Sequence, residues 1–207
     1  MRLAIIGASG HGKVVADAAE LAGWREVVFF DDAWPGLKQN GPWAVGGDTK
    51  GLLDDLTLFD GVVVAIGNNR IRLAKQRELL AAGASFASIV HPSAVVSPHA
   101  NIGDGTVVFA HAVVNACAVV GDGCIVNTGA VIEHDCVIGD FAHVSPNAVL
   151  AGGVTLGKLA WVGASSSVRQ LIEVGEAAVV GMGAVVTKAV PPGLTVAGNP
   201  AKVFTAR

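Results

Sequence analysis

A glycine-rich turn near the start of the chain has the residue types of a phosphate-binding loop. Residues 7–12 read Gly-Ala-Ser-Gly-His-Gly and lie between an apolar run, 2–6, and a segment with a helical pattern, 13–22. A strand, such a turn and a helix in succession direct backbone N–H groups at a ligand, and the helix dipole favours negative charge there. The glycines do not follow the Gly-x-Gly-x-x-Gly spacing, so a phosphate is indicated rather than a dinucleotide.

Polar residues also follow two further apolar runs in this part of the chain. Residues 31–32 are Asp-Asp and residues 67–69 are Gly-Asn-Asn; with residues 9–11 they stand at the ends of three predicted strands. Ligands of open α/β sheets bind at the carboxyl ends of strands, so we expect the three groups to converge on one site. In the alternative interpretation, the Asp and Asn pairs are ordinary turn residues.

The elements that must position these groups alternate between strand and helix. The predicted elements are strands at 2–6, 27–30 and 62–66 and helices at 13–22 and 71–82. This alternation predicts a small parallel α/β sheet. Residues 33–50 are rich in Gly, Pro and Trp and are expected to form a loop.

The rest of the chain is dominated by a six-residue repeat. Seventeen blocks without insertion run from Ile89 to Val190, and the second residue of every block is Val, Ile or Leu. The sixth residue is Ala, Cys, Ser, Thr, Val or Ile. A period of six fits neither an amphipathic helix nor a plain strand. It predicts a parallel β-helix of stacked coils, with the second residue pointing to the axis and a turn at each sixth residue.

The composition excludes several classes of function. The chain has 207 residues, a formal net charge of −3 and no cluster of Lys and Arg, so nucleic-acid binding has no electrostatic basis. No apolar run approaches the roughly 18 residues of a membrane span. We therefore expect a cytoplasmic protein without a membrane span.

The cysteines and histidines do not have the spacing of a metal site. Cys117, Cys124 and Cys136 form no Cys-x-x-Cys pair, and we expect them to be small buried thiols. Vertical neighbours in a coil of three blocks are eighteen residues apart, and no two histidines of the repeat have that separation. We expect no metal, with assembly of ligands across subunits as the alternative.

Five motifs are typical of one family: GASGHGKVV at 7–15, FFDD at 29–32, AIGNN at 65–69, IVHPSAVVSP at 89–98 and NTGAVIEHDCVIG at 127–139. With the repeat, they resemble bacterial nucleotide-sugar N-acetyltransferases of the hexapeptide-repeat class. The resemblance is closest to the UDP-4-amino-4,6-dideoxy-N-acetylglucosamine acetyltransferases of the bacillosamine pathway. It implies a Rossmann-like nucleotide-sugar-binding domain at 1–88 and a left-handed β-helix acetyltransferase domain with a C-terminal tail at 89–207.

The resemblance implies a catalytic pair at His134 and Asp135, where the family has a histidine followed by an acid. A neutral imidazole can take a proton from an attacking sugar amine, while a carboxylate on the other ring nitrogen fixes the tautomer. Neighbours on a strand point to opposite sides, so Asp135 must reach around a corner or act through its charge alone. No Ser or Cys resembles an activated nucleophile, which favours direct transfer in a ternary complex.

The same resemblance implies the binding partners: acetyl-CoA as donor and a nucleotide sugar as acceptor, in a homotrimer with active sites between subunits. Acetyl-CoA contacts are expected at Asn127, His143, Gly152, Ala164, Met182 and Lys202. Nucleotide-sugar contacts are expected at Ser9, Gly10, His11, Asp31, Asp32 and Gly67. His143 occupies a first block position, which is compatible with exposure to solvent, and the Gly152 N–H would stabilise the oxyanion.

The main prediction is therefore acetyl-CoA-dependent N-acetylation of the 4-amino group of a nucleotide-linked amino-dideoxy sugar. With the UDP sugar of the bacillosamine pathway the product would be UDP-N,N'-diacetylbacillosamine. A near alternative is O-acetylation of sialic acid or a similar sugar, with the same pair deprotonating a hydroxyl. A non-catalytic trimer that binds sugar nucleotides is an alternative of a different class.

Overall fold

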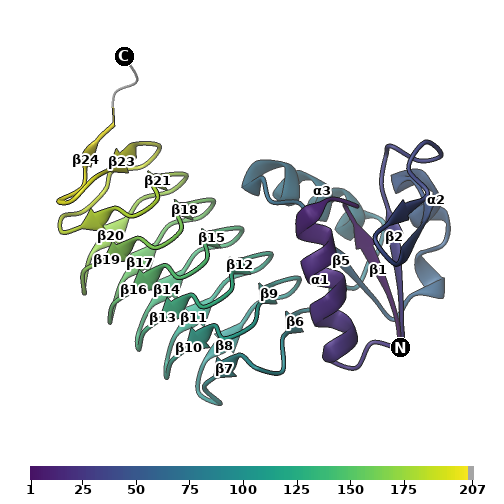
Figure 1. Ribbon diagram of the computed structural model, residues 1–207, viewed down its shortest axis with the longest axis horizontal. Coiled ribbons are helices and arrows are strands. Elements are labelled where there is room, and N and C mark those ends of the chain that lie inside the picture. Colours follow the sequence, from purple (N-terminus) through teal and green to yellow (C-terminus); the bar gives the residue numbers. More distant parts are fainter. Residues whose placement is uncertain (205–207) are drawn as a thin grey trace. The chain divides into compact units, whose positions relative to one another are not determined.

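The computed structural model of the protein describes residues 1–204. The chain divides into two compact units, Met1–Pro92 and Ser93–Arg207, a division close to the predicted boundary after residue 88. The first unit is α/β and the second is a parallel β-helix, so the predicted fold classes are confirmed (Figure 1).

The first unit is a mostly parallel sheet with helices packed on it. Its strands are β1 (Arg2–Ile6), β2 (Glu26–Phe30), β3 (Gln39–Asn40), β4 (Trp43–Gly47) and β5 (Gly61–Val64), in the order β3-β4-β2-β1-β5. Its helices are α1 (Gly10–Leu21), α2 (Thr49–Asp54), a 3₁₀ turn η1 (Leu56–Leu58) and α3 (Asn69–Ala81). β1 lies between β2 and β5 and is parallel to both, which makes its carboxyl end the point where the strand order reverses. A short strand, β6 (Ile89–Val90), ends the unit.

Two glycines of the first turn, Gly7 and Gly12, have steric roles in the structure. Gly7 has a φ of 104°, and a Cβ there would lie 2.8 Å from the Ala65 carbonyl oxygen. A Cβ on Gly12 would lie 2.3 Å from the carbonyl oxygen of Gly7 and 2.9 Å from the ring of Phe29. Gly12 is therefore required for the close approach of α1 to the sheet, and Gly7 is required for the turn to pass beside the Ala65 carbonyl.

The prediction of a loop at 33–50 is wrong, because the segment contains β3, β4 and the start of α2. Gly46 and Gly47, which suggested a turn, belong to β4. A Cβ on Gly46 would lie 2.9 Å from Cγ1 of Val28, so this glycine allows β4 to pack beside β2. In this strand the glycine serves close packing rather than chain reversal.

The second unit winds through three sheets, in which the strands of the repeats are all parallel. The first sheet contains β7 (Val95–Val96), β10 (Val113–Val114), β13 (Val131–Ile132), β16 (Val149–Leu150), β19 (Ser167–Val168) and β22 (Val185–Val186). The second contains β8 (Asn101–Ile102), β11 (Val119–Val120), β14 (Val137–Ile138), β17 (Thr155–Leu156) and β20 (Glu173–Val174). The third contains β9 (Val107–Val108), β12 (Ile125–Val126), β15 (His143–Val144), β18 (Trp161–Val162), β21 (Val179–Val180), β23 (Thr195–Ala197) and β24 (Lys202–Val203).

Paired strands are eighteen residues apart, as three blocks to a coil require. Val113 pairs with Val131, for example, and Val131 pairs with Val149. Figure 1 shows the coils of this unit stacked one on the next. Second-position residues such as Ile132 and Leu150 are fully buried along the axis.

The corner of each block lies at the fifth residue, one position before the predicted turn. From Gly105 to Gly183 every fifth block residue has a positive φ, including non-glycine residues such as Asp135 at 59° and Leu171 at 59°. The left-handed bend turns the chain so that the sixth residue points inward. Ala130 and Cys136 at sixth positions are therefore buried rather than placed at the turn.

Candidate functional site

The predicted catalytic residues line a cavity of about 270 Å³ in the β-helix unit. It is lined by His134, Asp135, Gly152, Gly153, Gln170 and Leu171. These residues come from three successive coils, at the block ends that follow β13, β16 and β19; we call this the His134 corner. Because equivalent residues are eighteen apart, Gly152 and Gln170 lie in one vertical row with His134. The family resemblance had implied His134 and Gly152, whereas Gln170 was not predicted.

His134 and Asp135 form a direct hydrogen bond of 2.7 Å between Nδ1 and Oδ2. The left-handed φ of Asp135 places the bend between the two side chains, so strand neighbours that would otherwise diverge meet at the corner. Both side chains remain accessible, with relative exposures of 64% and 66%. Asp135 thus reaches around the corner, the first of the two predicted arrangements.

The carboxylate changes the acid–base behaviour of the imidazole. The hydrogen bond that His134 donates to the Asp135 carboxylate raises the pKa of His134 above its ordinary value of 6.5, and the negative charges of Asp135 and Glu133 act in the same direction. Since Nδ1 is bound to Asp135, Nε2 is the ring nitrogen that can exchange a proton with a ligand.

The imidazole of His134 lies directly against Gly152 of the next coil. A Cβ on Gly152 would be 2.6 Å from both Cε1 and Nε2 of the ring, so only glycine allows this position. A Cβ on Gly153 would be 2.7 Å from Cδ2 of Leu171, which reaches down from the coil above. The glycine pair thereby opens a notch beside Nε2. Among residues 1–204 the Gly152 N–H has no hydrogen-bond acceptor, so it is free to bind an oxyanion.

Asn127 and His143 lie together on the outer face of the third sheet. The amide Nδ2 of Asn127 is 3.2 Å from Nε2 of His143, and the His143 ring stacks on Trp161 with centroids 5.6 Å apart. Trp161 in turn donates a 2.7 Å hydrogen bond to Ser145 Oγ. His143 is only 9% exposed, so the expectation of a solvent-compatible side chain is wrong: the Trp161 indole covers the ring. Trp161 and Ser145 were missed in the sequence.

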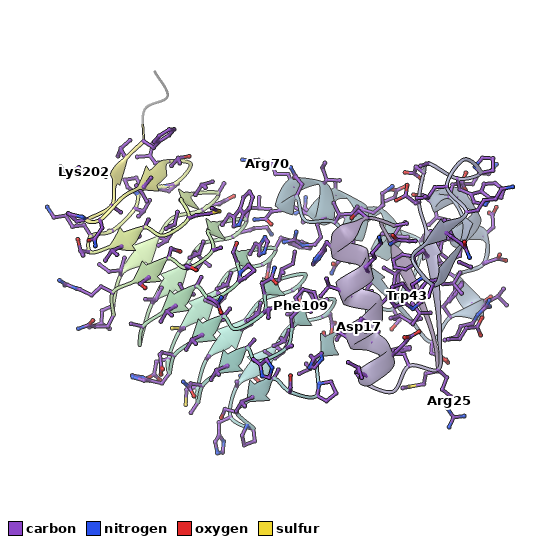
Figure 2. All side chains as sticks on the ribbon, in the orientation of Figure 1. Asp17, Arg25, Trp43, Arg70, Phe109 and Lys202 are labelled. Atoms are coloured by element: carbon purple, nitrogen blue, oxygen red, sulfur yellow. The ribbon has the colours of Figure 1, made fainter. Side chains whose placement is uncertain are left out.

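The remaining predicted acetyl-CoA residues lie elsewhere on the β-helix unit. Ala164 and Met182 are fourth block residues after β18 and β21, and Asn127 follows β12; we call this row of block ends the Met182 corner. Met182 is 80% exposed. Lys202, on β24 at the end of the repeats (Figure 2), lines a separate hollow of about 360 Å³. Within one chain, only Gly152 of the predicted acetyl-CoA residues adjoins His134.

A second cavity, of about 310 Å³, lies at the carboxyl ends of β1, β2 and β5. It is lined by Ile6, Gly7, Ser9, Asp31, Asp32, Thr49, Ile66, Gly67 and Lys75. The structure therefore brings together Ser9, Asp31, Asp32 and Gly67, as strand order requires. Gly10 and His11 are not among the lining residues. Thr49 and Lys75, from α2 and α3, were missed because nothing local marks them as directed at the sheet edge.

The two aspartates of this cavity are held by backbone N–H groups. Asp31 Oδ2 accepts a 2.8 Å hydrogen bond from the Ala8 N–H and thereby fixes the glycine-rich turn. Asp32 Oδ1 accepts from the Thr49 N–H at 2.9 Å, and its Oδ2 lies 3.6 Å from Lys75 Nζ. Hydrogen bonds from Thr49, with the Lys75 charge, lower the pKa of Asp32 below its ordinary value. The cavity thus presents carboxylate acceptors beside one cationic donor.

His11 differs from the other predicted residues of this unit. Burial, reinforced by the charge of Arg72, lowers the pKa of His11 to about 4. The imidazole is therefore neutral near pH 7.

Other expectations can be compared with the described residues. Cys124 and Cys136 are buried as predicted, but Cys117 is exposed, because it occupies a left-handed fifth position at a φ of 62°. Within residues 1–204 there is no group of three or more His, Cys, Asp or Glu side chains placed to hold a metal. Nor does any helix of that range have the length and apolarity needed to cross a membrane.

Both parts of the chain match families of known proteins. Residues 2–79 match the PglD N-terminal domain, and residues 117–152 match the bacterial transferase hexapeptide (six repeats) family. A UDP-N-acetylbacillosamine N-acetyltransferase of Bacillus subtilis (strain 168) is 37% identical over 109 residues, which cover 51% of this chain. That match spans 50% of the relative's length.

Solved structures resemble the chain over nearly its whole length. The acetyltransferase domain of PglB from Neisseria gonorrhoeae FA1090, in complex with acetyl coenzyme A, is 44% identical. It covers 98% of this chain and 98% of its own, with a TM-score of 0.93. PerB from Caulobacter crescentus, in complex with CoA and GDP-perosamine, is 35% identical, covering 99% of this chain and 98% of its own, again with a TM-score of 0.93.

Proposed function

This chain belongs to the bacterial sugar N-acetyltransferases that join a PglD-type N-terminal domain to hexapeptide repeats, and on that premise we propose its reaction and substrates. It transfers an acetyl group from acetyl-CoA to the 4-amino group of a nucleotide-linked amino-dideoxy sugar. The acceptor is UDP-4-amino-4,6-dideoxy-N-acetylglucosamine, and the product is UDP-N,N'-diacetylbacillosamine.

The observation that carries the proposal is the 2.7 Å hydrogen bond between His134 and Asp135 beside the Gly152–Gly153 notch. The pair is exposed, so two substrates can reach it. Its imidazole is oriented by a carboxylate on Nδ1, and Nε2 is directed to the notch. This is the arrangement that a general base for an amine requires.

The reaction follows from these groups without an acyl-enzyme. His134 Nε2 takes a proton from the amine as the nitrogen attacks the thioester carbonyl. The new N–C bond forms and the C–S bond breaks, and the proton passes from the imidazolium to the departing CoA thiolate. The Gly152 N–H is placed to stabilise the negative oxygen of the tetrahedral intermediate. Both thiols closest to the repeat axis, Cys124 and Cys136, are buried, which argues against a covalent intermediate.

The choice of a UDP sugar rests on resemblance rather than on geometry. The Bacillus subtilis relative is named for a UDP sugar and PerB was solved with a GDP sugar, at similar identities. The cavity at the end of β1 offers the carboxylate acceptors of Asp31 and Asp32 and the amino group of Lys75. These groups could bind either a uridine or a guanosine nucleotide. The five sequence motifs favour the UDP sugar.

A substrate panel tests this proposal. The purified protein is incubated with acetyl-CoA and, separately, with UDP-4-amino-4,6-dideoxy-N-acetylglucosamine, GDP-perosamine and sialic acid. Release of free CoA thiol gives the rate, and mass spectrometry identifies the product. We expect turnover with the UDP sugar at a kcat/KM well above the other two. Turnover of sialic acid alone would establish the O-acetylation alternative, and turnover of none would favour a binding protein.

A further inference from the structure

Arg72 on α3 is an almost completely buried charged side chain, with a relative exposure of 1%. Its guanidinium Nη1 donates to the carbonyl oxygens of Ile66 at 2.8 Å and Gly67 at 3.2 Å. Nη2 donates to Oδ1 of Asn69 at 2.9 Å. One planar side chain thus holds two successive carbonyls of the β5–α3 loop from the side of the protein interior.

The direction of these carbonyls fixes the direction of the N–H groups that follow them. In a trans peptide the C=O and the next N–H point in opposite directions. Because the Ile66 and Gly67 carbonyls turn toward Arg72, the N–H groups of Gly67 and Asn68 turn away from it. Ile66 and Gly67 line the cavity at the end of β1. Among residues 1–204 neither of these two N–H groups has an acceptor.

Two successive N–H groups that point the same way form a small anion-binding concavity. The chain beyond it is fixed as well, because the Asn68 side chain caps α3 by accepting from the N–H groups of Arg70 and Ile71. A Cβ on Gly67 would meet nothing within 4 Å, so there is open space in front of the loop. The concavity is therefore both held rigidly and accessible.

We propose that Arg72 is a positioning residue that turns the N–H groups of Gly67 and Asn68 toward the diphosphate of a bound nucleotide sugar. The inference rests on the proposed function for the identity of the ligand. It gives the diphosphate two backbone surfaces, the glycine-rich turn at α1 and the β5–α3 loop. It also places a fixed positive charge behind that loop.

The test compares three variants of the full-length protein. Arg72→Met removes the guanidinium, and Arg72→Lys keeps the charge but loses the planar fork that holds two carbonyls at once. Arg70→Met is the matched control, because Arg70 is an exposed arginine on the same helix (Figure 2). Calorimetric titration with UDP and with GDP measures affinity, circular dichroism checks folding, and steady-state kinetics separates the two KM values from kcat.

We expect Arg72→Met to weaken nucleotide binding about tenfold or more, the size expected for losing charge-assisted hydrogen bonds. Arg72→Lys should weaken it as well, but less. The KM for acetyl-CoA and the kcat at saturation should stay within about twofold of wild type, and Arg70→Met should match wild type throughout. If Arg72→Met does not fold, the folded Arg72→Lys protein decides the outcome.

Three results would overturn the positioning role. A folded Arg72 variant could bind the nucleotide as tightly as wild type, or its kcat and both KM values could change equally. The wild-type protein could also bind neither UDP nor GDP. A different result would refute the proposed function without refuting the role of Arg72. A wild-type protein that binds UDP but acetylates no amino sugar refutes the reaction, and the Arg72 comparison by titration remains decisive for the loop.

Discussion

At the scale of single residues, the Asp135 carboxylate decides the pH at which His134 can act as a base. Because the hydrogen bond raises the pKa of His134 above 6.5, the ring stays protonated to a higher pH than a free histidine. Only the neutral ring accepts a proton, so kcat/KM should rise with pH through that raised pKa. In Asp135→Asn the carboxylate is lost, and the midpoint of the rise should move down toward 6.5 with a lower plateau.

The pH–rate profiles of wild type and Asp135→Asn measure this shift. Asp140→Asn is the matched control, since Asp140 is a half-buried aspartate of the same β-helix that pairs with Lys158 at a different corner. Its profile should coincide with that of wild type. An unchanged midpoint in Asp135→Asn would show that the carboxylate does not tune the base.

Gly152 is a second residue whose identity the site requires. A methyl group there would lie 2.6 Å from the His134 ring, which must then move. Misplacement of a catalytic group by about 1 Å can cost roughly 10²-fold in rate, so Gly152→Ala should lower kcat on that order while leaving UDP affinity unchanged. Gly51→Ala in α2, where the nearest atom would be 3.5 Å away, controls for the added methyl. Gly152→Ala with full kcat would mean that the ring position is not critical.

Much of the site at this scale was predictable. The His-Asp pair and the polar ends of β1, β2 and β5 were visible as motifs. Whether the side chains of His134 and Asp135 contact each other could not be predicted from the sequence, because the contact depends on a left-handed φ at Asp135, which is not a glycine. Lys75 and Thr49 could not be identified, since both reach the cavity from helices that carry no local signal for it.

At the scale of elements, the coil of the β-helix is stabilised by its second block positions. Leu156 on β17 is 1% exposed, whereas its neighbour Thr155 is exposed. Leu156→Ala should leave a cavity on the axis and lower the free energy of unfolding by about 2–5 kcal/mol. Thr155→Ala on the same strand should change it by less than about 0.5 kcal/mol. Urea unfolding followed by circular dichroism measures both, and equal effects would contradict the axial assignment.

The elements were predicted unevenly from the sequence. The period of six located the strands from β6 to β22, because most aliphatic second residues mark buried positions, but it did not locate β23 and β24, which follow the last block. The placement of the corner was wrong by one residue, since small size at the sixth position reflects burial and not a turn. The prediction for residues 33–50 failed because Gly46 in β4 allows close packing against Val28. From the sequence alone, a glycine of this kind cannot be distinguished from a glycine in a loop.

At the scale of the whole molecule, the predicted acetyl-CoA residues lie in separate places on one chain. Gly152 adjoins His134, whereas Asn127 and Met182 belong to the Met182 corner. One acetyl-CoA can use both corners if a second copy brings its Met182 corner to the His134 corner of the first. A homotrimer with active sites between subunits, as the resemblance predicts, would bring the two corners together.

Mixed assemblies test that arrangement. Sedimentation equilibrium should give three chains, and a His134→Ala protein co-expressed with a Met182→Glu protein should yield hybrids with an intact site. Each variant alone should be nearly inactive, because one lacks the base and the other carries a charge at the apolar corner. An active monomer, or hybrids no more active than either parent, would contradict shared sites.

The central claim is that His134 is the base that deprotonates the sugar amine. Its most direct test is the kcat of His134→Ala with acetyl-CoA and the UDP amino sugar, beside His99→Ala as an exposed-histidine control. We predict a fall in kcat of roughly 10²-fold or more with UDP affinity and folding unchanged, and no effect of His99→Ala. A folded His134→Ala protein that turns over at the wild-type rate would contradict the account.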